Sequence, residues 1–366
     1  MNGIQYHSNF NPNQVDFSYS ISGAISSFKV TLYYSADGLL DGSDIGVFSQ
    51  YVTVDAGANP HSGSFQFLGA VPGDPNRPYL IAVADPDNAI AESDETDNVS
   101  NTLLRPTVSL TTDASVYTLM DTSTITAAVN TPLAGSALIQ GTRTGADSWT
   151  RLGYGPTLNY VQRIAGQFTL DSYVTVGNVR FDSTYVFVTV RFPSYTQIIA
   201  SPSVQDFAIE AWNNTLAYAQ NNAGAPDATG AYPNSQRREA GFWITLDTST
   251  GRYQRTTTDY GPAVGPNDGA YVNLSGKPAD QKADPQLSDG SAIYLVASFH
   301  THTPSTYRQK GRAVGPSGTD QNIDNQDNVV GIVYDYIGVG GNAPAGFPLR
   351  SLAQLYPSGP TRRSTP

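Results

Sequence analysis

Short segments in which apolar and polar residues alternate, separated by turn residues, recur along most of this chain. A period of two is typical of strands that bury one face, and turns about every 8–12 residues are typical of all-β sandwiches. The alternation is clear over residues 15–21 and 28–34, 79–85 is a further strand candidate, and 123–129, 137–141, 167–170 and 185–192 are candidates rich in β-branched and aromatic residues. We therefore predict one antiparallel sandwich over residues 1–105 and a second over 106–200.

The pattern changes after residue 200. Apolar residues recur at helical spacing from Val204 to Leu216, behind a predicted capping box at 203–206 and ahead of a stop signal at 221–224. Strand patterns return over residues 241–246, 291–299 and 329–334. A helix followed by a sheet predicts an α+β domain over 201–350. Residues 351–366 are predicted to be a tail, and the composition of 357–366 is typical of a disordered end.

Composition excludes several function classes. The chain of 366 residues has a net charge of −11, which argues against a nucleic-acid partner. No apolar run reaches the roughly eighteen residues that a membrane-spanning helix needs, and the N-terminal sequence lacks the basic and apolar regions of a signal peptide. The absence of cysteine excludes disulfides, zinc–thiolate sites and cysteine nucleophiles.

Two of the four histidines share one tripeptide, His300-Thr301-His302, at the end of an apolar segment. On a strand, residues two apart project to the same face about 6–7 Å from each other, so both imidazoles can reach one ion. Asp320 follows a Gly-Pro turn and is the candidate third ligand, and Glu239 precedes a strand as the candidate base. A His-His-carboxylate set with an open position is typical of hydrolytic zinc sites. The alternative is that these histidines are only hydrogen-bonded at a strand end.

Glu239, His300-Thr301-His302 and Ser317-Gly318-Thr319-Asp320 together resemble the JAMM (MPN-type) metalloprotease family, in the form found in secreted bacterial proteins and Rhs-type toxins. The resemblance covers roughly residues 203–340. It implies an α+β fold with zinc held by His300, His302 and Asp320. It also implies that Glu239 is the general base and acid, that Ser317 stabilises the oxyanion, and that peptide or isopeptide bonds are hydrolysed.

The chain departs from this family's pattern at two places. Seventeen residues separate His302 from Asp320, more than in the compact form of the motif, and Thr303 stands where the motif usually has proline. The loop at 305–312 contributes three cations, Arg308, Lys310 and Arg312. These cations either select an acidic substrate or belong to a solvated loop, and the sequence leaves both interpretations open.

Residues 32–45 and 84–98 resemble the cell-adhesion-related bacterial domain (CARDB), an Ig-like sandwich of extracellular proteins. The resemblance implies an extracellular or cell-surface location and a spacer or adhesive role for residues 1–105. The same segments contain two acidic loops, with Asp37, Asp41 and Asp44 in one and Asp85, Asp87, Glu92, Asp94, Glu95 and Asp97 in the other. These carboxylates either supply oxygen ligands to calcium or serve as ordinary turn residues.

Two functions from different classes follow. The leading hypothesis is a zinc-dependent hydrolase that acts on a protein or peptide substrate and is joined to two Ig-like sandwiches. The alternative is a non-catalytic subunit of a surface layer, fibre or appendage, which reuses the JAMM fold as a scaffold and assembles with itself or with a cell-surface partner. A Pro/Arg-rich end that is ordered by a neighbouring subunit would favour this alternative.

Overall fold

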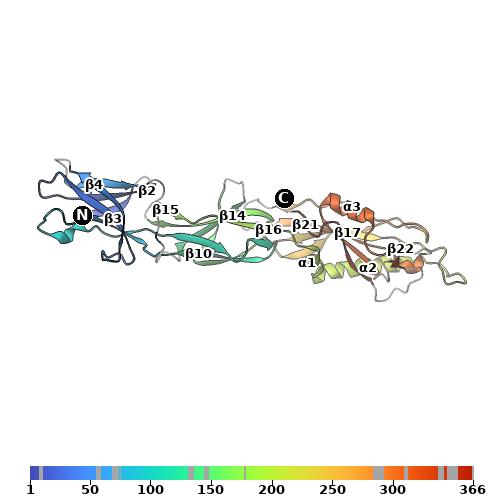
Figure 1. The fold of residues 1–366 in the computed structure, drawn as a ribbon. Helices are drawn as coiled ribbons and strands as arrows, with labels where there is room; N and C mark the ends of the chain where they lie inside the picture. Colours follow the sequence, from blue (N-terminus) through green and yellow to red (C-terminus); the bar gives the residue numbers. More distant parts are fainter. Residues whose placement is uncertain are drawn as a thin grey trace. The chain divides into compact units, whose positions relative to one another are not determined.

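The computed structural model describes residues 1–7, 11–54, 59–67, 74, 76–130, 136–143, 148–176, 179–282, 292–308, 312–336, 342–343 and 353–364 (Figure 1). Strands predominate in this part of the chain, which confirms a mostly β fold built from several sheets. Residues 309–311 of the predicted basic loop, and residues 351, 352, 365 and 366 of the predicted tail, lie outside the described residues.

The N-terminal segment contains two antiparallel sheets. Its strands are β1 (Gly3–His7), β2 (Asn11–Tyr19), β3 (Ser27–Ser35), β4 (Ile45–Thr53), β5 (His61–Gln66), β6 (Tyr79–Ala84) and β7 (Leu103–Leu104), with a 3-10 helix at Glu95–Asn98. The sheets have the orders β1-β2-β5 and β4-β3-β6-β7. Alternate residues of both sheets, such as Phe17 on β2 and Leu32 on β3, meet in one buried cluster. This is the burial that the period-two pattern predicts.

The next segment forms two further sheets. Its strands are β8 (Val108–Thr112), β9 (Val116–Thr118), β10 (Thr122–Val129), β11 (Leu138–Arg143), β12 (Thr150–Tyr154), β13 (Thr157–Val161), β14 (Gly166–Val176), β15 (Val179–Asp182) and β16 (Val186–Arg191). One sheet has the order β13-β10-β8. The other has the order β12-β11-β14-β16-β9, with β15 paired to β14. The predicted strands at 123–129, 137–141, 167–170 and 185–192 are confirmed.

The C-terminal segment combines helices with a mixed sheet. Its elements are α1 (Tyr195–Ile199), α2 (Pro202–Asn221), β17 (Ala240–Asp247), β18 (Arg252–Arg255), β19 (Asp259–Tyr260), β20 (Gln281–Lys282), β21 (Ala292–Thr301), a 3-10 helix at Ser305–Tyr307, β22 (Arg312–Ala313), α3 (Gly318–Asp327), β23 (Val330–Tyr336), β24 (Asn342–Ala343) and β25 (Ala353–Ser358). The main sheet has the order β18-β17-β21-β23-β25, with β19 paired to β17 and β20 to β21.

Two helices cover this sheet. α2 packs on β17, β18 and β21, while α3 packs on β23 and β25, and Figure 1 shows the two helices on opposite sides of the sheet. β21 and β23 run parallel, and parallel neighbours need a crossover connection, which here contains α3. Within the described residues, no helix combines the length and apolar character needed to cross a membrane.

The contacts divide the chain into two compact units. One contains Met1–Ala114, Ser123–Tyr160 and Thr169–Phe187, and the other contains Ser115–Thr122, Val161–Phe168 and Val188–Pro366. All the residues of the candidate site belong to the second unit. The predicted domain boundaries after residues 105, 200 and 350 stay predictions.

Helix positions differ from the sequence-based expectation at two places. α2 begins at Pro202 after Ser201, so the predicted capping box at 203–206 lies inside the helix. Proline is favoured at the first helical position because it has no backbone N–H to leave unsatisfied there. The second difference is α3, which the sequence does not predict as a helix. Its only large apolar residue is Ile323, so hydrophobic periodicity gives no signal.

The predicted disordered end at 357–366 is wrong for the part that the structure describes. Pro357 and Ser358 end β25, which pairs antiparallel with β23. Arg363 then forms a bidentate ion pair with Asp280, with both N–O distances at 2.7 Å. Composition favours disorder here, but the main-chain pairing of β25 and this partly buried ion pair outweigh it.

Candidate metal centre

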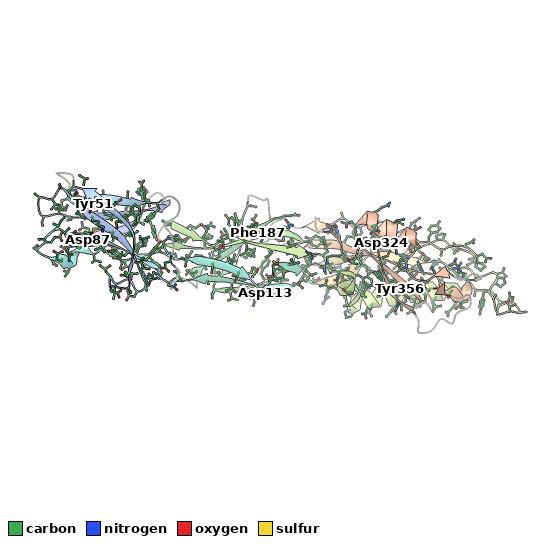
Figure 2. All side chains as sticks on the ribbon, in the orientation of Figure 1. Tyr51, Asp87, Asp113, Phe187, Asp324 and Tyr356 are labelled. Atoms are coloured by element: carbon green, nitrogen blue, oxygen red, sulfur yellow. The ribbon has the colours of Figure 1, made fainter. Side chains whose placement is uncertain are left out.

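The two candidate histidine ligands lie at the end of β21, in the middle of the mixed sheet. Strand alternation turns Thr301 away from them, towards α2, where its hydroxyl lies 2.8 Å from that of Thr215. Ser298, two residues before His300, faces the opposite way and donates a 2.5 Å hydrogen bond to Asp324. Asp324, labelled in Figure 2, lies on α3. The histidine side chains therefore emerge on the α3 side of the sheet.

Asp320 is held in place by the first turn of α3. The Ser317 hydroxyl accepts a hydrogen bond from the Asp320 N–H at 3.2 Å, and Asp320 Oδ2 accepts one from the Ser317 N–H at 2.6 Å. This reciprocal arrangement is a capping box. The Ser-x-x-Asp spacing thus starts the helix and also aims the Asp320 carboxylate towards the histidines.

The structure brings His300, His302 and Asp320 together. Their ligand atoms all lie within 4.8 Å of one another, and no other group of this kind occurs among the described residues. Each histidine Nε2 is 3.5 Å from an Asp320 oxygen. Two ligands bound to zinc at about 2.1 Å with a tetrahedral angle lie about 3.4 Å apart. The three side chains are therefore close enough to share one metal ion such as zinc.

The second nitrogen of His302 is also occupied. Its Nδ1 lies 2.8 Å from Oδ2 of Asp335, a fully buried carboxylate on β23. Burial by itself lowers the pKa of His302, but contacts with Asp320 and Asp335 and the charge of Glu239 outweigh it and raise the pKa to about 9. A metal ion would replace the proton that these carboxylates favour on Nε2.

His300 Nε2 is buried and makes no regular hydrogen bond within the described part of the chain, its polar neighbour being an Asp320 oxygen at 3.5 Å. A buried nitrogen that is paired this weakly is costly, and a metal ion would satisfy it. Burial raises the pKa of Asp320, yet the nearby His300 and His302 outweigh this effect and hold that pKa well below its usual range. Asp320 is therefore ionised at neutral pH, as a metal ligand must be.

Glu239 lies just before β17 and lines the same cavity as the three candidate ligands. β17 pairs antiparallel with β21, with Gly241 opposite His300, so continuing this register by two residues places Glu239 opposite His302. The Ala240 N–H donates a 3.0 Å hydrogen bond to the Thr301 hydroxyl. The middle residue of the His-x-His tripeptide thus fixes the backbone next to Glu239.

The threonine at the usual proline position has a specific partner. Arg237 is fully buried and donates a 2.6 Å hydrogen bond to the Thr303 hydroxyl. Its other terminal nitrogen donates to the carbonyls of Gly265 and Asp268, at 2.6 and 2.9 Å. Thr303 therefore joins the strand end of the histidines to the segment that precedes Glu239, a link that proline is unable to make.

The candidate ligands open into a cavity of about 730 Å³. Its lining includes Trp243 and Leu274 as apolar groups and Arg308 as a cation. The described end of the predicted basic loop therefore reaches the cavity. The side chains of Lys310 and Arg312 lie outside the description, so the choice between acidic substrate selection and a solvated loop stays open.

Sequence reasoning missed Asp335, Arg237, Ser298 and Asp324. The sequence does contain one indication of Asp335, which is a carboxylate inside an otherwise apolar and aromatic strand. A charge that is buried there requires partners. The sequence contains no such indication of Arg237 and Asp324, since their neighbours come from segments that are distant in the sequence.

The acidic loops of the N-terminal segment act as turn acceptors. Asp41 accepts a 2.7 Å hydrogen bond from the Ser43 N–H, Asp85 accepts one of 2.7 Å from the Ile90 N–H, and Asp94 accepts one of 2.9 Å from the Thr96 N–H. The contacts of Asp41 and Asp94 span two residues, as in Asx turns, which are ordinary turn chemistry. Calcium binding at these loops stays a prediction.

Comparisons with known proteins provide no family for this chain. It matches no protein-family model and no curated protein. Among solved structures, it matches the full ectodomain (Ig1–Ig3) of mouse nectin-like molecule 4 with 15% sequence identity and a TM-score of 0.21. The match spans 52% of this chain and 64% of that ectodomain. A TM-score this low carries no argument about fold or function.

Proposed function

We propose that this chain is a zinc-dependent hydrolase of peptide or isopeptide bonds, with a JAMM-like α+β unit joined to two Ig-like sandwiches, the first of them CARDB-like. The observation that supports it is the convergence of His300, His302 and Asp320, with Glu239 lining the same cavity. The JAMM and CARDB resemblances imply a location outside the cell or on its surface for such a protein, and the proposed substrate is a protein or peptide.

In this proposal His300, His302 and Asp320 hold the ion. When bound, zinc supplies Lewis acidity that polarises a carbonyl group and lowers the pKa of a water molecule towards neutrality. Glu239 accepts a proton from the attacking water as the water oxygen bonds to the carbonyl carbon. Glu239 then delivers that proton to the leaving nitrogen as the C–N bond breaks.

Ser317 has a second role in this proposal. Its oxygen accepts the capping hydrogen bond from the Asp320 N–H, so its own O–H remains available as a donor. Ser317 is exposed and lines the cavity. It therefore donates to the oxyanion that develops on the substrate carbonyl.

The first test measures bound zinc by mass spectrometry in protein purified without chelator. We expect about one zinc per chain in the wild type and in Glu239→Gln, and none in His302→Ala, because His302 is a proposed ligand and Glu239 is not. His61→Ala is the matched control, since His61 stacks on Tyr19 in the N-terminal sheets and should leave the zinc content unchanged.

The second test measures cleavage of quenched peptide and lysine-isopeptide substrates. We expect Glu239→Gln to lose roughly 100- to 10,000-fold in rate while keeping its zinc, because it removes the proton carrier. Full activity in Glu239→Gln contradicts the proposed mechanism. Absence of zinc from the wild type, even after zinc is added back, favours the alternative of a non-catalytic surface subunit.

A further inference from the structure

One buried carboxylate touches the candidate centre without being one of its ligands. Asp335 lies on β23 and is fully buried. Its Oδ2 lies 2.8 Å from His302 Nδ1 and also accepts a hydrogen bond from the Gly315 N–H at 2.9 Å. One oxygen therefore contacts both the end of β21 and the turn that leads into α3.

The two groups that meet at Asp335 belong to different parts of the centre. His302 is a candidate ligand from β21. Gly315 lies two residues before Ser317, whose capping box aims Asp320. Gly315 has a φ of +84°, a left-handed conformation that side chains rarely adopt. The turn therefore depends on glycine, and its N–H is fixed by Asp335.

We propose that Asp335 is the positioning residue of the metal centre. It accepts the Nδ1–H of His302, which fixes the tautomer and ring orientation in which Nε2 faces Asp320, and it fixes the turn that presents Asp320. This inference rests on the zinc site of the proposed function, but it does not depend on catalysis. Carboxylates that accept the second N–H of a ligating histidine orient it and raise its basicity as a ligand.

The site offers a physical reason why this residue is a carboxylate. A buried charge is costly unless it is paired and hydrogen-bonded. Asp335 meets this condition through His302 and Gly315, and the pairing becomes part of the metal centre. An apolar residue at 335 would pack in the strand but leave His302 free to rotate about its side-chain bonds.

The test measures zinc affinity of the full chain by competition with a chromophoric chelator. We expect Asp335→Ala to weaken zinc binding by roughly 10- to 100-fold. Asp335→Asn keeps an acceptor oxygen of the same shape and removes the charge, and we expect a loss of about tenfold. Asp280→Ala is the matched control, because Asp280 pairs with Arg363 outside the cavity and should leave the affinity unchanged.

A second readout separates positioning from a general structural role. In zinc-loaded protein with ¹⁵N-labelled histidine, the Nδ1–H of His302 should give a protected, downfield proton signal. We expect this signal to shift in Asp335→Asn and to disappear in Asp335→Ala, while Asp280→Ala retains it. If Asp335→Ala does not fold, the near-isosteric Asp335→Asn decides the question.

The outcomes distinguish this inference from the proposed function. Wild-type affinity together with an unchanged His302 signal in Asp335→Asn overturns the role of Asp335 and leaves the zinc site intact. A wild-type chain that binds no zinc overturns both. Weaker binding with an altered His302 signal, in variants whose melting shows that they are folded, supports the assignment.

Discussion

At the scale of single residues, His302 is the group whose protonation matters most. It lies between two carboxylates, with Nε2 3.5 Å from Asp320 and Nδ1 2.8 Å from Asp335. Both carboxylates favour the doubly protonated imidazolium in the metal-free protein. A metal ion therefore competes with a proton for Nε2 of this residue.

Metal-free stability should fall as the pH rises. The pKa of His302 is raised to about 9 in the folded protein from 6.5, so its contribution is fully present below about pH 6.5 and is lost as the pH rises through about 9. We expect the free energy of unfolding to fall by about 1–3 kcal/mol over this range. Urea unfolding of chelator-treated protein at several pH values measures this fall in the free energy of unfolding.

The comparison with His302→Gln isolates this contribution, because glutamine does not titrate. The difference in the free energy of unfolding between wild type and His302→Gln should become smaller as the pH rises. Zinc-loaded wild type should lack this decline, since the ion needs the deprotonated nitrogen. A difference between wild type and His302→Gln that is constant with pH is incompatible with the raised pKa.

At the scale of elements, one four-residue motif has two consequences. Ser317 and Asp320 cap α3, and the cap turns Asp320 towards the histidines. Gly331 on β23 lets α3 approach the sheet closely, because a Cβ there would lie 1.8 Å from Oδ2 of Asp324. The start of the helix and its close packing together determine where the carboxylate ligand lies.

Removing the cap should weaken the protein measurably. We expect Ser317→Ala to lower the free energy of unfolding by about 1 kcal/mol, because the Asp320 N–H loses its acceptor. Ser201→Ala is the matched control, since Ser201 precedes α2 and its side chain makes no capping hydrogen bond. Chemical denaturation measures both, and an equal loss in the two variants would contradict the role of the cap.

At the scale of the whole molecule, the C-terminal end belongs to the second unit. Arg363 joins residues far apart in the sequence: it pairs with Asp280, donates a 2.6 Å hydrogen bond to the Leu295 carbonyl and lies 4.6 Å from the centre of the Phe192 ring. Phe192 packs in turn on Tyr294 of β21. Arg363 is therefore anchored by contacts within its own unit.

Loss of this anchor should destabilise the second unit. We expect Arg363→Ala to lower its free energy of unfolding by about 2 kcal/mol, because charged hydrogen bonds at a partly buried site are lost. Arg363→Lys should retain less than half of the stability that Arg363→Ala loses. An ammonium group lacks the planar guanidinium that binds both oxygens of Asp280. Exposed Arg252→Ala should change stability by less than about 0.5 kcal/mol. Thermal and urea unfolding test these values.

The sequence by itself determined many of the strands, the position of α2 to within a few residues and the residue types of the candidate metal centre. These features are local: alternation reports which face of a strand is buried, and His300-Thr301-His302 places two imidazoles on one face. Glu239 and the Ser317–Asp320 spacing are also visible in the sequence, but there they are only candidates for a base and for a third metal ligand.

Tertiary structure alone decided which groups meet. Asp335 reaches His302 from a neighbouring strand, and Arg237 reaches Thr303 across sixty-six positions of sequence. Tertiary contacts also order residues 357–364, which have a disorder-like composition. The physical reason is that hydrogen bonds and ion pairs depend on distance in space, whereas sequence patterns report only local periodicity and residue type.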